Sequence, residues 1–252
     1  MYDGEVKAKE AGYMKTIRLL YPDYVSGGLE TYYFGANLMA HILPSNEAQP
    51  LVKVEITPPD REEKPVKDGI YAKDEVLAGI QDAMEKIESE NPDRIITIGG
   101  NCMVSLAPFD YLHGKYKNTG IIWIDAHPDV SMTKDGYPNA HAMVLGSLMG
   151  YGDSALSGQM KNEKFKPDEI LYVGLQSLHD YQKQFHSTYF ANEELVGDGS
   201  GGGRMTMEKL EKVLHVITEN SDVAGFTIAE YLPFDEHHLH KIFSDINIFT
   251  EK

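Results

Sequence analysis

Residues 121–132 read IIWIDAHPDVSM, in which four large apolar residues lead directly into Asp125, His127 and Asp129. Side chains on an extended segment point alternately to opposite faces, so these three project together if the strand geometry persists as far as Asp129. Two carboxylates and an imidazole on one face form a possible metal-ligand set. The alternative is a polar strand end whose side chains hydrogen-bond to neighbouring helix N-termini.

The composition limits the partners of the chain. Its 252 residues carry a formal net charge of −16, which argues against nucleic acid and anionic membranes, because both require a basic face. A single cysteine, Cys102, excludes an internal disulfide and suits a reducing compartment. No apolar run approaches the roughly 20 residues that cross a bilayer. We therefore expect a cytoplasmic protein.

Strand-like and helix-like segments alternate along the chain. Strands are expected at 15–21, 51–56, 94–100, 120–125, 170–175 and 223–231, and helices at 29–42, 71–90, 103–114, 141–150, 206–219 and 235–246. Apolar strands separated by helices are typical of a parallel sheet covered on both faces. We predict an α/β protein, a three-layer α/β/α sandwich with a mainly parallel sheet. Residues 1–13 are interpreted as a flexible leader and 14–252 as a single domain.

Polar residues follow three of the expected strands at the point where each one ends. They are Cys102 after a glycine pair, Asp125 after IIWI, and Glu230 after FTIA. Functional residues of parallel sheets gather at the carboxyl ends of the strands, so we expect these side chains to meet. Cys102 alone would be interpreted as a small buried apolar residue, but its position after Gly99-Gly100 makes it a candidate ligand.

Four segments together resemble motifs of the ureohydrolase family of arginases, agmatinases and formimidoylglutamases. They are TIGGNCMVS (97–105), WIDAHPDVS (123–131), NAHAM (139–143) and FTIAEYLP (226–233). The resemblance implies an arginase-like domain that hydrolyses a linear amidine or guanidine C–N bond with a metal-activated hydroxide. It also implies two Mn²⁺ ions, a small cationic or formimino substrate, and a homo-oligomer.

The resemblance assigns a role to each matching residue. Asp125 would bridge the two ions, Asp129 would bind the first ion and His127 the second. His141 stands where the family has a proton-shuttling histidine, and Glu230 would face the cationic head of the substrate. Two alternatives remain open, since His141 could cap a helix and Glu230 could form a structural ion pair.

Two departures from the family pattern set this chain apart. Cys102 replaces the histidine ligand of the family, and Asn101 replaces the preceding aspartate. A thiolate is a soft ligand, so Zn²⁺ or Fe²⁺ becomes possible in place of Mn²⁺. The Asp-x-Asp-x-x-Asp-Pro motif of the family, which supplies two further metal ligands, is absent.

The missing motif predicts that a strand is lacking near residues 184–187. We favour an omitted piece of chain over a deletion, because each buried unpaired backbone group costs about 1–3 kcal/mol. If the chain is whole, the alternative function is a non-catalytic arginase-fold protein. Its degenerate metal site would then act in binding or in contact with a partner protein.

Overall fold

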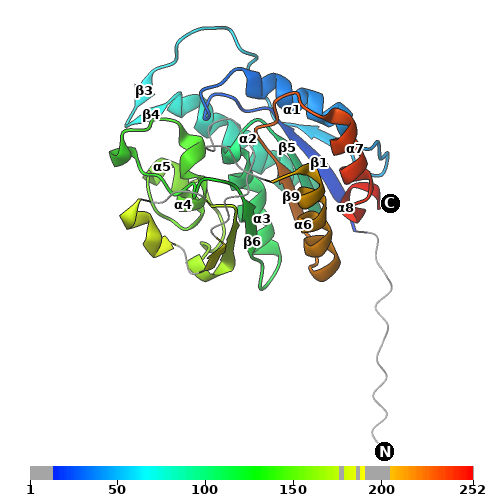
Figure 1. Ribbon diagram of the computed structural model, residues 1–252. Coiled ribbons are helices and arrows are strands. Elements are labelled where there is room, and N and C mark those ends of the chain that lie inside the picture. Colours follow the sequence, from blue (N-terminus) through cyan, green and yellow to red (C-terminus); the bar gives the residue numbers. More distant parts are fainter. Residues whose placement is uncertain (1–13, 176–178, 186–187, 191–204, 252) are drawn as a thin grey trace, which may run out of the picture.

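Seven strands of the computed structural model form two parallel sheets (Figure 1). The structure describes residues 14–175, 179–185, 188–190 and 205–251. One sheet has the order β2-β1-β5-β9, with bounds Leu51–Lys53, Thr16–Tyr21, Arg94–Gly99 and Gly225–Ile228. The other has the order β6-β7-β8, with bounds Ile121–Ile124, Ile170–Val173 and Thr188–Phe190. All strand pairs in both sheets are parallel.

Helices cover the larger sheet on both faces, which confirms the predicted three-layer architecture (Figure 1). They are α1 Thr31–Ile42, α2 Lys73–Glu90, α3 Leu106–Lys115, α4 Val144–Leu148, α5 Ser154–Ser157, α6 Met207–Asn220, α7 Glu236–Ser244 and α8 Asn247–Thr250. Alternate residues of β1 enter two different cores. Ile17 and Leu19 pack with residues of α2 and α3, whereas Leu20 packs with residues of α1, α7 and α8. This is the burial pattern expected of a parallel strand between two helical layers.

The division of the sheet between β9 and β6 is a departure from the prediction of one sheet. Within the described residues, β9 pairs only with β5, and β6 pairs only with β7. Ile124 of β6 nevertheless packs in the same apolar cluster as Phe226 and Ile228 of β9. The two sheets therefore meet through side chains without sharing a backbone ladder.

A short hairpin was missed by the sequence analysis. Strands β3 (Val66–Lys67) and β4 (Ile70–Tyr71) pair antiparallel, and helix α2 begins only after them. Asp68 and Gly69 both have positive φ, at 51° and 81°. This is the geometry of a type I′ turn, for which Asp-Gly is a favoured pair.

Parts of the domain prediction fall on residues outside the described ranges. The leader 1–13 lies outside them, as do residues 186–187 of the junction predicted near 184–187. Gln184 and Phe185 belong to a 3-10 helix, Asp180–Phe185. Within the described ranges, no helix combines the length and the apolar character that crossing a membrane requires.

Candidate metal centre

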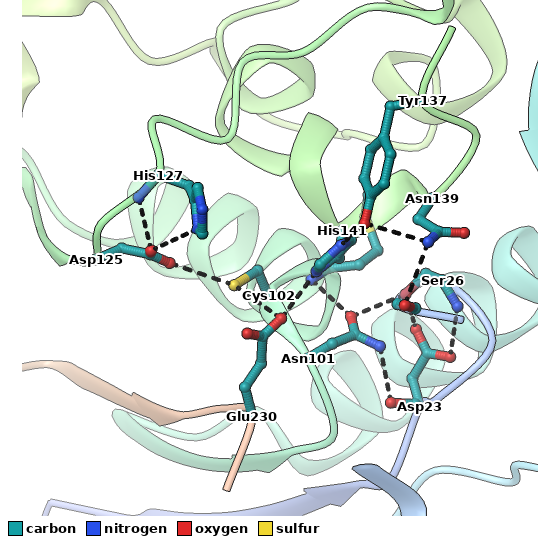
Figure 2. Close-up of polar contacts among 12 residues, drawn as sticks. Asp23, Ser26, Asn101, Cys102, Asp125, His127, Tyr137, Asn139, His141 and Glu230 are labelled. Carbon is teal, nitrogen blue, oxygen red and sulfur yellow. Dashed lines mark hydrogen bonds and ion pairs between the residues drawn. The ribbon is translucent and has the colours of Figure 1, made fainter. Parts of the chain in front are cut away.

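The end of β5 is held in place by a close backbone contact. A Cβ on Gly100 would overlap the carbonyl oxygen of Asp23 and lie 2.7 Å from its carbon, so only glycine fits there. The buried Asn101 side chain donates to Asp23 O at 2.8 Å and accepts from Met103 N at 3.0 Å. The second of these bonds caps the 3-10 helix Cys102–Ser105. Asn101 therefore orients the turn that presents the Cys102 side chain (Figure 2).

The segment after β6 bends away from strand geometry. The strand ends at Ile124, His127 N donates to Asp125 Oδ1 at 2.8 Å, and Asp129 has a φ of 47°. The premise that Asp125, His127 and Asp129 share one face of an extended strand is therefore wrong. The Asp125 carboxylate holds the backbone two residues onward in a turn, as aspartate often does.

The bend still brings two of the three side chains together with Cys102. Donor atoms of Cys102, Asp125 and Asp129 all lie within 4.8 Å of one another, and Cys102 Sγ is 3.6 Å from Asp125 Oδ2. His127 is not in this group. Its side chain is 55% exposed, and its Nδ1 lies 3.4 Å from Asp125 Oδ1 (Figure 2).

A second group of possible ligands shares the same sulfur. Donor atoms of Cys102, His141 and Glu230 also lie within 4.8 Å of one another. Glu230 Oε1 is 3.7 Å from Cys102 Sγ and 2.8 Å from His141 Nδ1 (Figure 2). The other ring nitrogen of His141, Nε2, lies 2.9 Å from the Tyr137 hydroxyl. Because both ring nitrogens have these partners, the His141 side chain does not act as a helix cap.

Burial and negative charge dominate the electrostatics of the site. Burial, reinforced by the charges of Asp129, Glu230 and Asp125, raises the pKa of the Cys102 thiol well above its ordinary value. Burial and the charge of Asp125 likewise raise the pKa of Asp129, whose Oδ2 is buried without a hydrogen-bond partner among the described residues. A hydrogen bond to Asp125 raises the pKa of His127. A bound metal ion would offset the charges of such a cluster.

The donors fit one ion better than the two that the resemblance implies. Cys102, Asp125 and Asp129 provide a thiolate and two carboxylates, which is a sufficient protein contribution for one catalytic metal. The second donor group, Cys102, His141 and Glu230, shares the same sulfur, and His127 lies beside Asp125 outside both groups. The described residues therefore fit one ion better than the Mn²⁺ pair.

Sequence reasoning missed three residues that support the site. Asp23 and Ser26 follow the carboxyl end of β1, where the strand-end rule could have found them. Ser26 Oγ donates to Asn101 Oδ1 at 2.8 Å, and His141 N donates to Ser26 O at 3.0 Å. Tyr137 lies in an irregular loop, where no periodicity marks it.

Comparison with known protein families gives a match in sequence. The sequence model of the arginase family matches residues 47–201, which is more than half of the chain. The chain belongs to the arginase family. This confirms the resemblance to ureohydrolases.

Relatives within the arginase family are distant in sequence. The arginase of Bacillus caldovelox is 32% identical over 94 residues, covering 36% of this chain and 31% of that protein. The arginase of Staphylococcus aureus (strain MRSA252) is 26% identical over 122 residues, covering 47% of this chain and 40% of that protein. The chain thus spans 40% or less of the length of these two curated relatives.

Solved structures of the family share the fold over almost the whole chain. Entamoeba histolytica arginase, in complex with L-ornithine, superposes with a TM-score of 0.71 at 16% identity, covering 94% of this chain and 98% of that one. Formimidoylglutamase from Bacillus subtilis gives a TM-score of 0.54 at 15% identity, covering 93% and 85%. At these identities the likeness establishes the three-layer fold and no more.

Proposed function

We propose that the chain is a metal-dependent hydrolase that cleaves a C–N bond in a small linear amidine or guanidine. One observation carries this proposal: Cys102, Asp125 and Glu230, which follow three different strands, bring their donor atoms to one partly open site. Membership of the arginase family supports the reaction type. The electrostatics also support it, because a buried anionic cluster favours a metal ion and a cationic substrate.

The ion would be held by Cys102, Asp125 and Asp129. When bound, it would supply Lewis-acid activation of water at neutral pH, which an unreactive amidine carbon requires. The buried Asp129 Oδ2 is available as a ligand because no other described group engages it. The Cys102 thiolate favours Zn²⁺ or Fe²⁺, whereas Mn²⁺ is the ion that the family resemblance implies. All three ions are therefore candidates.

Two further residues would act on the substrate. The Glu230 side chain is 33% exposed, and its carboxylate can pair with a cationic amidinium or guanidinium group. His141 can carry a proton at Nδ1 to the departing amine, while Tyr137 orients the ring through Nε2. The complex of the Entamoeba arginase with L-ornithine supports a ligand of this cationic type.

Activity measurements with defined metals test the proposal. The protein is loaded separately with Mn²⁺, Zn²⁺ and Fe²⁺, and assayed with arginine, agmatine, guanidinobutyrate and formiminoglutamate for release of urea or formamide. We expect turnover that Asp125→Asn abolishes, and that Asp74→Asn leaves unchanged because Asp74 is a surface residue on α2. Absence of turnover with every metal and substrate would favour the alternative, a non-catalytic binding or partner protein.

We also propose that the chain forms a homo-oligomer through an apolar patch. Phe34 and Leu38 lie one turn apart on α1, and both are exposed. Leu232 and Phe234 are also exposed and follow Tyr231, whose carbonyl oxygen packs closely against α1. Such patches often mark protein contacts. Light scattering should give a multiple of 28.2 kDa, and a monomer at micromolar concentration would refute this proposal.

A further inference from the structure

The sulfur of Cys102 lies between two carboxylates that belong to different ligand groups. It is 3.6 Å from Asp125 Oδ2 on one side and 3.7 Å from Glu230 Oε1 on the other. On the Asp125 side the third donor is a second carboxylate, Asp129. On the Glu230 side the third donor is the His141 imidazole. The two groups therefore differ in chemistry as well as in position.

We propose that Cys102, His141 and Glu230 form a separate binding site for a thiophilic divalent cation of the zinc class. This site uses residues that the proposed hydrolysis assigns to substrate and proton transfer, and it shares only the sulfur with the Asp125–Asp129 pair. It is an alternative position for an ion, filled when the cation prefers sulfur and imidazole to oxygen.

The spacing of the donors supports tetrahedral coordination. With Zn–S of about 2.3 Å and Zn–O of about 2.1 Å, a tetrahedral angle puts sulfur and oxygen about 3.6 Å apart. The observed distance between Cys102 Sγ and Glu230 Oε1 is 3.7 Å, so these two side chains need no movement. The corresponding N···O separation would be about 3.4 Å. His141 Nδ1 and Glu230 Oε1 are 2.8 Å apart, so they must separate by about 0.6 Å as the cation replaces the shared proton.

The surroundings of His141 suit a metal ligand. A ligating histidine uses one ring nitrogen for the ion and gives the other N–H to an oriented acceptor. Here Nδ1 faces Cys102 and Glu230, while Nε2 lies 2.9 Å from the Tyr137 hydroxyl. The Tyr137 oxygen is in turn held by Asn139 Nδ2 at 3.2 Å. With an ion at Nδ1, Nε2–H would donate to the Tyr137 hydroxyl and keep the ring oriented.

Burial and access also fit an exchangeable ion. Cys102 is 6% exposed, which removes the thiolate from competing water, whereas Glu230 is 33% exposed and leaves a route from solvent. Cys102, His141 and Glu230 would supply three ligands, one each of sulfur, nitrogen and oxygen. This is the number of protein ligands in a zinc site whose fourth position is open to water.

Co²⁺ is the probe for the test, because a thiolate bound to Co²⁺ produces a charge-transfer absorption that oxygen ligands do not. The full-length protein is titrated with Co²⁺, and Zn²⁺ is then added to displace it. We expect the charge-transfer band in the wild type and its loss in Cys102→Ser. Since even a partner outside the coordination shell changes metal affinity 10–100-fold, removing a ligand should weaken Co²⁺ binding by about 100-fold or more.

Two isosteric carboxylate variants provide a matched comparison. Glu230→Gln and Asp125→Asn each neutralise one carboxylate at almost the same distance from Cys102 Sγ. The inference expects about a 100-fold loss of Co²⁺ affinity in Glu230→Gln and in His141→Gln, and less than about tenfold in Asp125→Asn. Far-UV circular dichroism verifies that each variant is folded.

An equal or larger loss in Asp125→Asn would overturn the inference, and so would a Co²⁺ affinity of His141→Gln equal to that of the wild type. Because the readout is ion binding and not turnover, the outcome is independent of whether the hydrolase proposal holds.

Discussion

Replacing Gly100 by alanine should disrupt the backbone that positions the candidate metal centre. Its N–H donates to Tyr21 O at 3.0 Å, and its carbonyl accepts from Glu230 N at 3.0 Å, so Gly100 connects the ends of β1 and β9. An alanine Cβ would lie 2.7 Å from the carbonyl carbon of Asp23, about 0.8 Å closer than two carbons pack comfortably. The obstacle is backbone, which cannot rotate away, so we expect a loss of about 3 kcal/mol, the upper end for overpacking.

Urea denaturation measures this loss, with the fluorescence of Trp123 as a probe of β6 and far-UV circular dichroism as a global signal. For an m value of about 3 kcal/mol per molar urea, Gly100→Ala should lower the midpoint by about 1 M. Gly136→Ala is the control, because its Cβ would meet nothing within 4 Å and its φ of 76° costs only about 1 kcal/mol. If the two variants lower the midpoint equally, the close approach at Gly100 is not what makes glycine necessary.

Three further substitutions probe ion pairs away from the site. Lys73 Nζ is 2.9 Å from the half-buried Asp153 and 3.0 Å from the exposed Asp68. In urea denaturation, Lys73→Met should therefore lower the free energy of unfolding by about 2 kcal/mol, and Asp68→Asn by less than about 0.5 kcal/mol. A hydrogen bond from Lys115 lowers the pKa of Asp93 in the folded protein. The Asp93 carboxylate therefore stabilises the fold fully above its unfolded pKa of about 3.9. This stabilisation is lost as the pH falls through the folded pKa. Asp93→Asn should therefore lower Tm at pH 7 and converge with the wild type below about pH 3. A Tm difference that persists at low pH would contradict this.

Local sequence patterns predicted most elements because burial repeats with the period of the element. Val76, Ile80 and Ile87 of α2 are all buried, as their spacing requires, and the helix was located within two residues of its start. The hairpin at 66–71 escaped because its strands have two residues each, too few for alternation to be visible. The division between β9 and β6 escaped for a different reason. An apolar run predicts that a segment is a strand, but it does not predict which strand pairs with it.

The candidate site was predictable to the extent that it follows strand ends. Cys102, Asp125 and Glu230 were located by that rule, and the structure brings their donor atoms together. His127 was placed with Asp125 and Asp129 on the assumption that side chains continue to alternate as in a strand. The strand ends at Ile124, because the His127 N–H donates to the Asp125 carboxylate and the chain turns there. Pairing of side chains across loops has no local signature, so the contact of His141 with Tyr137 required the structure.

The candidate metal centre draws its residues from both sheets. Cys102 follows β5 of the four-stranded sheet, whereas Asp125 follows β6 of the three-stranded sheet. Within the described residues, no strand ladder joins the two sheets, and Ile124 contributes only apolar contacts to the cluster at β9. An ion bound to both Cys102 and Asp125 would stabilise the folded chain by about 2.7 kcal/mol at a concentration of 100 Kd. Because its ligands come from both sheets, that free energy would be lost when either sheet unfolds, so ion binding would couple the two into one cooperative unit.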